Sequence, residues 1–303
     1  MKWLKRLFKA LLAYRLFGPD LAPRFRPPQV HPWRITGRTV FVGDEEFLVR
    51  QAGPADGPAV VLIHGLAGSS LAEWYRVGPL LADRFRLIMV DNRAHGLSPR
   101  SRSRFEVDEG ADDIAAVLDV LGTGSATVVG YSLGGTIAQA LAHRHPERVR
   151  SLVLIATFSH HSPMWRFART LGSLLVRAWE RVTGAGTAEV RAGYLLATGA
   201  VEPQHARWLW EETRRRDPDA GAQASMAMLR FDSREWVRRI KVPITVVIPI
   251  HDQLVPIAWQ YGLAADIGTP DVVEVPGGRH ELPWTHAEML AAVIARSVGT
   301  RRS

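Results

Sequence analysis

Residues 126–135 are Ala126-Thr127-Val128-Val129-Gly130-Tyr131-Ser132-Leu133-Gly134-Gly135. The β-branched run before Gly130 predicts a short strand, and residues 136–142 have the composition of a helix. A Gly-x-Ser-x-Gly motif between a strand and a helix is typical of a sharp turn that lifts the serine hydroxyl clear of a sheet. Gly130 and Gly134 suit such a turn, because a Cβ at either position would clash where the helix approaches the strand. The alternative is a glycine-rich turn with an ordinary serine, and the motif alone leaves it open.

Strand-like and helical segments alternate along most of the chain. Apolar runs that predict buried strands occupy residues 59–64 and 86–91. Further strands are predicted at 149–156, 243–249 and 271–275. Residues 38–51 have the pattern of a hairpin, and residues 107–121 and 288–298 have that of amphipathic helices. This alternation predicts an α/β fold with a mostly parallel central sheet flanked by helices.

Residues 158–239 interrupt the alternation. They contain no apolar strand-like run, but four helical ones, at 165–182, 188–197, 203–216 and 220–231. We therefore expect a helical cap inserted into an α/β core. The predicted organisation is a basic amphipathic helix at 1–18, a Pro-rich connector at 19–35, a core formed by 36–157 and 240–299, and the cap at 158–239.

Composition and charge exclude several classes of protein. The 303-residue chain has no cysteine, which rules out disulfides, thiolate metal sites and a cysteine nucleophile. Its net charge is +8, but residues 1–26 carry seven basic side chains against one acidic side chain, and Arg301 and Arg302 add two more positive charges. The residues between these ends are neutral overall, so we expect no basic groove and no nucleic-acid partner.

The N-terminal segment has a helical pattern with two faces. Aromatic and leucine side chains share one face and basic side chains share the other, the pattern of a helix that lies in a membrane interface. We expect residues 1–17 to bind an anionic membrane surface, in a cytoplasmic protein held at the inner face of the membrane. The alternative is a helix docked on the protein itself. The chain has no run of about 20 apolar residues, the length that a transmembrane helix needs.

Four polar positions follow predicted strands. They are the dipeptide His64-Gly65, Ser132, Asp252 and His280. In an open parallel sheet, sites form at the carboxyl ends of the strands. The chain order of serine, aspartate and histidine is also the order of the α/β-hydrolase arrangement. With the runs Asp91-Asn92-Arg93-Ala94-His95-Gly96-Leu97-Ser98 and Gly278-Arg279-His280, residues 36–298 resemble the α/β-hydrolase superfamily, in its capped esterase, lipase and C–C hydrolase branches.

The resemblance implies a role for each of these residues. Ser132 is the nucleophile, His280 the base and acid, and Asp252 the residue that orients His280. The backbone N–H groups of Leu66 and Leu133 form the oxyanion hole. No cofactor is implied, and no metal is expected at His160-His161, since no further ligand has suitable spacing.

Other positions concern loop shape rather than chemistry. His64 and His95 are expected to hold their loops by hydrogen bonds. Ala94 stands where the family commonly has glycine, and Pro249 also departs from the family pattern.

The expected substrate is a lipophilic ester. Apolar side chains predicted near the serine or in the cap are Trp74, Tyr131, Phe158, Met164, Trp165 and Leu196. Two alternatives use the same three residues, namely acyl transfer and C–C bond cleavage. A third alternative is a non-catalytic binding protein. The presence of all three residues argues against it, because binding alone does not need a serine, an aspartate and a histidine in this arrangement.

Overall fold

One eight-stranded sheet organises the molecule, with the strand order β1-β2-β4-β3-β5-β6-β7-β8. β2 runs antiparallel to β1 and β4, and the remaining neighbours run parallel. The computed structural model describes residues 32–98, 105–161, 193–214 and 218–299. The strands are β1 Gly37–Val42, β2 Glu45–Ala52, β3 Ala59–Ile63, β4 Arg86–Val90, β5 Ala126–Tyr131, β6 Val149–Ile155, β7 Ile244–Pro249 and β8 Asp271–Val275.

The register brings the ends of the parallel strands to one edge. Ile63 of β3 pairs with Gly130 of β5, Tyr131 pairs with Ile155 of β6, and Pro249 of β7 pairs with the last residue of β8. The loops that follow these strands therefore emerge side by side. The residues predicted to act together lie in three of them.

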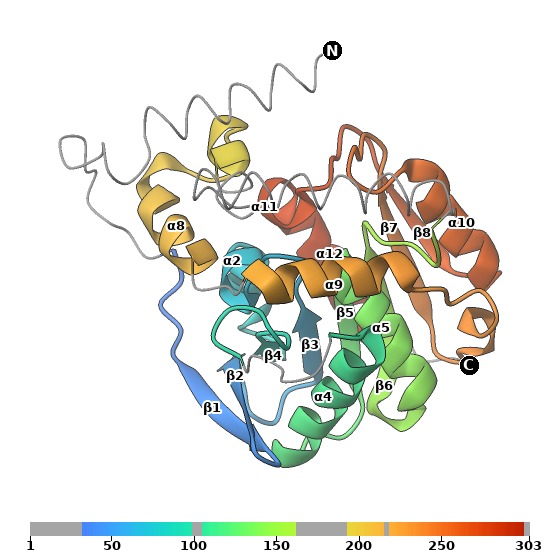
Figure 1. The fold of residues 1–303 in the computed structure, drawn as a ribbon, viewed down its shortest axis with the longest axis horizontal. Coiled ribbons are helices and arrows are strands. Elements are labelled where there is room, and N and C mark those ends of the chain that lie inside the picture. The colour runs from blue at the N-terminus through green and yellow to red at the C-terminus, as the bar shows by residue number, and fades with distance from the viewer. Residues whose placement is uncertain (1–31, 99–104, 162–192, 215–217, 300–303) are drawn as a thin grey trace.

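Helices cover both faces of the sheet (Figure 1). On one face, α4 (Val107–Val120), α5 (Leu133–Arg144) and α10 (Ile257–Ile267) enclose an apolar core with residues of α9 (Pro218–Arg230). On the other face, α2 (Ser70–Trp74), α3 (Val77–Leu81), α11 (Leu282–Thr285) and α12 (Ala287–Gly299) enclose a second core with residues of α8 (Ala206–Arg214). Burial on both faces explains why the central strands are apolar throughout.

The sequence predicted most of these elements. The hairpin, the predicted strands and the helices at 107–121 and 288–298 are all present, and the α/β fold is confirmed. β8 lies at the edge of the sheet and is mostly exposed. Three helices were not predicted, namely α3, α10 and α11. α3 and α11 are too short to show a helical period. In α10, most residues are apolar, which hides the contrast between two faces.

The segment between β6 and β7 is helical where it is described. It contains a helical stretch at 193–197, a 3₁₀ turn at Pro203–His205, α8, α9 and a second 3₁₀ turn at Val237–Arg239. An isolated bridge pairs His160 with Asp232. The helix expected at 165–182 and the first part of that at 188–197 lie outside the described residues. The division into a core and a cap, with boundaries at 158 and 239, stays a prediction.

The predicted N-terminal helix at 1–18 and most of the connector at 19–35 also lie outside the described residues. Across the part of the chain that the structure does describe, no helix has the length and apolar character needed to span a membrane.

Candidate active site

Ser132 lies on the turn between β5 and α5, as the motif predicts. Its backbone has φ 53° and ψ −116°, a conformation that non-glycine residues rarely adopt. Adjacent hydrogen bonds hold this turn, since the Ser132 N–H donates to the Ile155 carbonyl at 2.9 Å and the Thr157 hydroxyl donates to the Ser132 carbonyl at 2.9 Å. The side chain of Ser132 is thereby fixed at the carboxyl edge of the sheet.

The two glycines of the motif are required by close backbone approach. A Cβ added to Gly130 would lie 2.3 Å from the Gly134 carbonyl oxygen, and one added to Gly134 would lie 2.2 Å from the Ile63 carbonyl oxygen. Real Cβ atoms essentially never come so near to other heavy atoms. The structure therefore bears out the clash that the sequence led us to expect.

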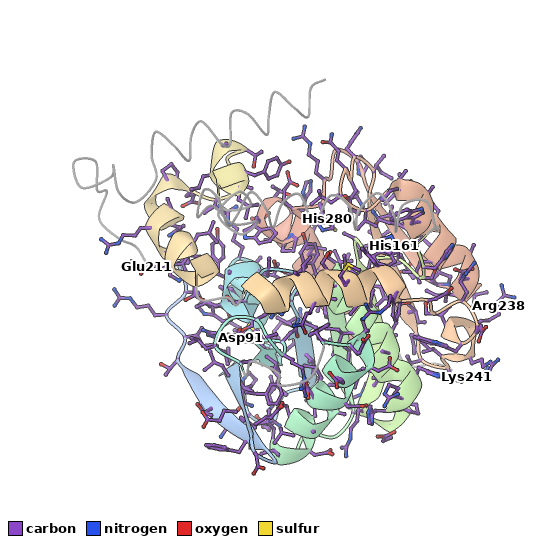
Figure 2. The ribbon with its side chains drawn as sticks, viewed as in Figure 1. Asp91, His161, Glu211, Arg238, Lys241 and His280 are labelled. Atoms are coloured by element: carbon purple, nitrogen blue, oxygen red, sulfur yellow. The ribbon has the colours of Figure 1, made fainter. Side chains whose placement is uncertain are left out.

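His280 connects Ser132 to Asp252 across three different loops. Its Nε2 lies 3.1 Å from the Ser132 hydroxyl oxygen, and its Nδ1 lies 2.8 Å from Asp252 Oδ2. The histidine follows β8 and the aspartate follows β7, so residues 148 positions apart meet at one edge. Figure 2 shows His280 close to α11, in the interior of the molecule.

Asp252 is held as an acceptor by its surroundings. The carboxylate is fully buried. Its Oδ1 accepts from the N–H groups of Leu254 at 2.8 Å and Val255 at 3.0 Å, and Oδ2 accepts from the Gln260 amide at 3.0 Å. These donors leave Oδ2 oriented toward His280. Gln260 comes from α10, and sequence reasoning missed it because α10 itself was not predicted.

Tyr131, which precedes Ser132 in the chain, contacts His280. Its hydroxyl donates to the His280 carbonyl at 2.9 Å, and the two rings lie 5.2 Å apart. The sequence placed Tyr131 among the substrate-binding residues. In the structure it is fully buried and packs against the histidine loop and Trp284.

The loop after β3 carries the predicted oxyanion donor Leu66. His64 Nδ1 lies 2.8 Å from the Gly65 carbonyl oxygen, and the Asn92 N–H donates to His64 Nε2 at 2.8 Å. This pattern places the ring proton on Nδ1, so the ring donates to the Gly65 carbonyl. Because a trans peptide is planar, the Leu66 N–H then points the opposite way from that carbonyl. His64 thus fixes the orientation of the peptide that bears the predicted donor, the loop-holding role expected of it.

A buried carboxylate fills the inside of the same loop. Glu73 of α2 is fully buried, and its Oε2 accepts from the Gly65 N–H at 2.5 Å. A Cβ on Gly68 would lie 2.6 Å from Glu73 Oε1. The second predicted donor, Leu133, is the first residue of α5 and directly follows Ser132.

The run 91–98 is tied to the rest of the fold by its charged residues. The Asp91 carboxylate, labelled in Figure 2, accepts from the Ser70 N–H at 2.8 Å, the Ser70 hydroxyl at 2.6 Å, Arg50 at 3.1 Å and the Leu97 N–H at 3.0 Å. Arg93 binds both oxygens of Asp113 on α4. Burial raises the pKa of the Asp113 carboxyl, although Arg93 acts to lower it. These contacts fix the run 91–98 to the start of α2, to β2 and to α4.

Ala94 has φ 64°, in the left-handed region that favours glycine. Ala94 thus adopts a backbone conformation open to glycine, at a cost for a residue with a side chain. The Pro249 carbonyl accepts from the Asp252 N–H at 3.2 Å.

A family model described as the alpha/beta hydrolase fold matches residues 58–287. The chain belongs to the α/β-hydrolase fold family. It is similar to a putative carbamate hydrolase RutD from Caulobacter sp. (strain K31), 30% identical over 249 residues that cover 80% of this chain and 91% of the relative. It is also similar to a pimeloyl-[acyl-carrier protein] methyl ester esterase from Chromobacterium violaceum, 32% identical over 255 residues that cover 81% of this chain and 96% of the relative.

Solved structures agree with this α/β-hydrolase assignment at the level of the fold. A hydrolase from Pseudomonas aeruginosa PA01 superposes with a TM-score of 0.75 at 22% identity, covering 88% of this chain and 99% of the other. The enol-lactonase from Burkholderia xenovorans LB400 gives a TM-score of 0.72 at 24% identity, covering 87% of this chain and all of the other.

The predicted substrate-binding residues of this α/β hydrolase are scattered. Trp74 is fully buried in the core beneath α2, and Phe158 is fully buried in the core on the opposite face of the sheet. Leu196 is half-buried, and Met164 and Trp165 lie outside the described residues. Trp74, Tyr131 and Phe158 thus present almost no surface to a ligand here, and a substrate-binding role stays a prediction for all six residues.

His161 packs between two aromatic rings. Its ring lies 4.0 Å from that of Phe158 and 4.5 Å from that of Trp259, and Figure 2 labels it beside α10. Within the described ranges, no group of three or more His, Cys, Asp or Glu side chains could hold a metal ion.

A cavity of about 890 Å³ lies at the opposite edge of the sheet. Its lining includes Lys241, Thr245 and Asp271, at the amino ends of β7 and β8. Figure 2 shows Arg238 and Lys241 at the periphery, away from His280. The cavity is therefore remote from Ser132 and is not the candidate active site.

Proposed function

We propose that this α/β hydrolase cleaves a carboxylic ester of a lipophilic substrate through an acyl-enzyme formed on Ser132. The observation that carries the proposal is the His280 ring, with Nε2 3.1 Å from the Ser132 hydroxyl and Nδ1 2.8 Å from the buried carboxylate of Asp252. A serine hydroxyl becomes a useful nucleophile only when an adjacent base removes its proton.

The reaction proceeds in two halves. In the first, Ser132 Oγ attacks the ester carbonyl carbon while His280 Nε2 takes the hydroxyl proton, and Asp252 stabilises the imidazolium. The N–H groups of Leu66 and Leu133 donate to the oxyanion. The C–O bond then breaks, and His280 gives its proton to the leaving alcohol. In the second half, His280 deprotonates a water that attacks the acyl-enzyme, which releases the carboxylic acid and restores Ser132.

The relatives support acyl chemistry at a carbonyl carbon. They include a methyl ester esterase, a 3-oxoadipate enol-lactonase from Acinetobacter baylyi and a putative carbamate hydrolase. An ester, a lactone and a carbamate all pass through a tetrahedral oxyanion at one carbonyl. The lipophilic preference rests on the apolar residues predicted for the cap.

An acyl-chain series tests this proposal. Wild type and Ser132→Ala are compared on p-nitrophenyl esters from acetate to laurate, with a methyl ester and an aryl carbamate beside them. We expect kcat/KM of wild type to rise with chain length and Ser132→Ala to be inactive. A kcat/KM that falls with chain length would contradict the proposal of a lipophilic substrate. A higher kcat/KM on the carbamate than on the esters would contradict the proposal that the substrate is an ester. Products formed with added alcohol distinguish hydrolysis from acyl transfer.

We also propose that residues 1–17 bind an anionic membrane surface at the cytoplasmic face. The support is the sequence pattern, with basic side chains on one helical face and Trp3, Leu4 and Phe8 on the other. A lipophilic ester could then reach the site from the membrane.

A further inference from the structure

Residues 193–214, between β6 and β7, share a hydrophobic core with the elements around the site. Leu195, Trp208 and Leu209 are buried in the same cluster as Tyr131 and Trp284. The Trp208 ring lies 5.1 Å from that of Tyr75, directly after α2. Apolar packing therefore contributes to holding this segment against α2 and α11.

The first polar link runs from α8 to the loop that carries Leu66. The Ser69 hydroxyl donates to Glu212 Oε2 at 3.1 Å and accepts from the Ala72 N–H at 3.2 Å. Ser69 is the N-cap of α2 and lies three residues after Leu66. Glu212 is buried, with 6% of its surface exposed, which is costly for a carboxylate unless it is hydrogen-bonded. Its position facing Ser69 ties α8 to the end of the predicted oxyanion loop.

The second polar link reaches the loop of the catalytic histidine. The Tyr194 hydroxyl donates to Glu281 Oε1 at 3.1 Å, and Glu281 directly follows His280. The Glu281 carboxylate is also buried, and its backbone carbonyl accepts from the N–H groups of Trp284 and Thr285 at the start of α11. Burial, together with the negative charge of Glu281, raises the pKa of the Tyr194 phenol. Tyr194 therefore stays protonated and donates this bond near neutral pH.

The two links end on two different loops of the candidate site. Glu212 reaches the loop that presents Leu66, and Tyr194 reaches the residue next to the base. Each depends on one side chain of the segment 193–214. Misplacement of a catalytic group by about 1 Å can cost on the order of 100-fold in rate.

We propose that Glu212 and Tyr194 are positioning residues, which hold the oxyanion loop and the His280 loop in the geometry needed for catalysis. The inference rests on the proposed function, and it adds that residues of the helical segment act on the chemical step itself rather than on substrate binding alone. The substrate does not contact them in this role, so their loss lowers kcat and leaves KM nearly unchanged.

Conservative variants test the proposal. Tyr194→Phe removes only the hydroxyl that donates to Glu281. Glu212→Ala removes the acceptor for Ser69, and Glu212→Gln keeps an amide oxygen that can accept the same bond. The matched control is Arg207→Ala, which breaks an exposed ion pair with Glu211 within α8. Glu211 lies at the outer edge of the molecule, far from His280 (Figure 2).

The measurements are kcat and KM on a soluble ester, the rate of labelling by a fluorophosphonate, and the melting temperature. We expect Tyr194→Phe and Glu212→Ala to lower kcat and the labelling rate on the order of 10-fold, a tenth of the loss quoted for a full 1 Å shift. KM should stay near that of wild type, and Glu212→Gln and Arg207→Ala should retain wild-type kcat. The melting temperature of Tyr194→Phe should match that of the control, which separates positioning from unfolding.

Three results would overturn the inference. They are wild-type kcat in both Tyr194→Phe and Glu212→Ala, an equal loss in Arg207→Ala, or a loss confined to KM. Wild-type protein that neither hydrolyses esters nor reacts with the fluorophosphonate would instead refute the proposed function, which is a different outcome of the same experiment.

Discussion

At Ser132 the backbone adopts a conformation that costs about 1–3 kcal/mol for a residue with a side chain. With φ 53° and ψ −116°, the residue persists because its N–H, its carbonyl and both flanking glycines are fixed by neighbours. The same constraint holds the hydroxyl within reach of His280. The strain and the proposed reactivity of this serine therefore have one structural origin.

Gly134→Ala should disrupt this arrangement. The new Cβ would meet the Ile63 carbonyl oxygen at 2.2 Å, so the helix and the strand must separate. We expect a loss of about 1–3 kcal/mol in unfolding free energy, typical of overpacking, together with a large loss of esterase activity. Urea unfolding and ester hydrolysis measure the two effects.

Gly221→Ala provides the control for that substitution. Gly221 lies in α9, and among the described residues no atom outside its own helix backbone and chain neighbours lies within 4 Å of its added Cβ. Alanine in a helix interior is favoured over glycine by roughly 1 kcal/mol. This variant should be as stable as wild type or more stable, with unchanged activity. Equal destabilisation by both variants would contradict the role of the close approach at Gly134.

Asp252→Asn should separate orientation from folding. The asparagine oxygen can still accept from the Leu254 and Val255 N–H groups, but its NH₂ cannot accept from His280 Nδ1. We expect kcat to fall roughly 10³- to 10⁴-fold, as in the serine–histidine–aspartate template. Circular dichroism should show a folded protein. A loss smaller than tenfold would contradict the assignment of Asp252.

At the scale of elements, the site depends on where parallel strands end. The loops after β3, β5, β7 and β8 carry the predicted oxyanion donor, the proposed nucleophile, the proposed orienting aspartate and the proposed base, and α10 supplies Gln260 against Asp252. On the sheet face covered by α4 and α5, ion pairs join the two helices. Arg144 binds both oxygens of Asp112, at 2.8 and 2.7 Å, and His145 Nε2 lies 2.7 Å from Asp112 Oδ1.

This pair gives stability a defined pH dependence. The hydrogen bonds from Arg144 lower the pKa of Asp112 below its ordinary value. A carboxyl whose pKa is lower in the folded state stabilises the fold above its unfolded pKa, and this contribution is lost as the pH falls through the folded value. Asp112→Asn should therefore cost at most about 1 kcal/mol at pH 7, because the pair is partly exposed and screened.

The loss of unfolding free energy caused by Asp112→Asn should become smaller as the pH falls below about 4, where free aspartate protonates. Denaturant unfolding across this range measures the difference between variant and wild type. A difference that persists unchanged at low pH would contradict the assignment.

The sequence predicted helices and strands correctly where the hydrophobic pattern of a segment matches the faces that the fold buries. The strand runs at 59–64 and 149–156 are apolar because both faces are covered, and the Gly-x-Ser-x-Gly turn is read directly from its glycines. Contacts between distant residues left no local signal, among them Gln260 with Asp252, Glu73 with Gly65 and Tyr194 with Glu281. Each of these depends on the packing of a whole helix.

At the scale of the whole molecule, the excess positive charge and the candidate active site lie in different parts of the chain. Residues 1–26 carry a net charge of +6, whereas the residues that surround Ser132 come from the neutral remainder. The described fold begins with Pro32 and Trp33, and the Trp33 ring packs on Gly78 of α3. Cleavage of a water-soluble ester at the proposed site should therefore not depend on the proposed membrane segment.

Removal of residues 1–31 tests this separation. A chain that begins at Pro32 keeps the Trp33 contact, and we expect it to hydrolyse water-soluble esters at the wild-type rate. Full-length protein should float with anionic vesicles, because basic side chains near an anionic surface contribute about 1 kcal/mol each. The shortened chain should remain unbound. Equal flotation of the two proteins would contradict membrane binding by residues 1–17.

The most direct test of the account is covalent labelling of Ser132. Intact-mass and peptide mass spectrometry after reaction with a fluorophosphonate should show one adduct, on the peptide that contains Ser132. Ser132→Ala should show none, and His280→Ala should react far more slowly, since the base would be missing. Undiminished labelling of Ser132→Ala, or an adduct on another residue of the wild-type protein, would contradict the proposal that Ser132 is the nucleophile.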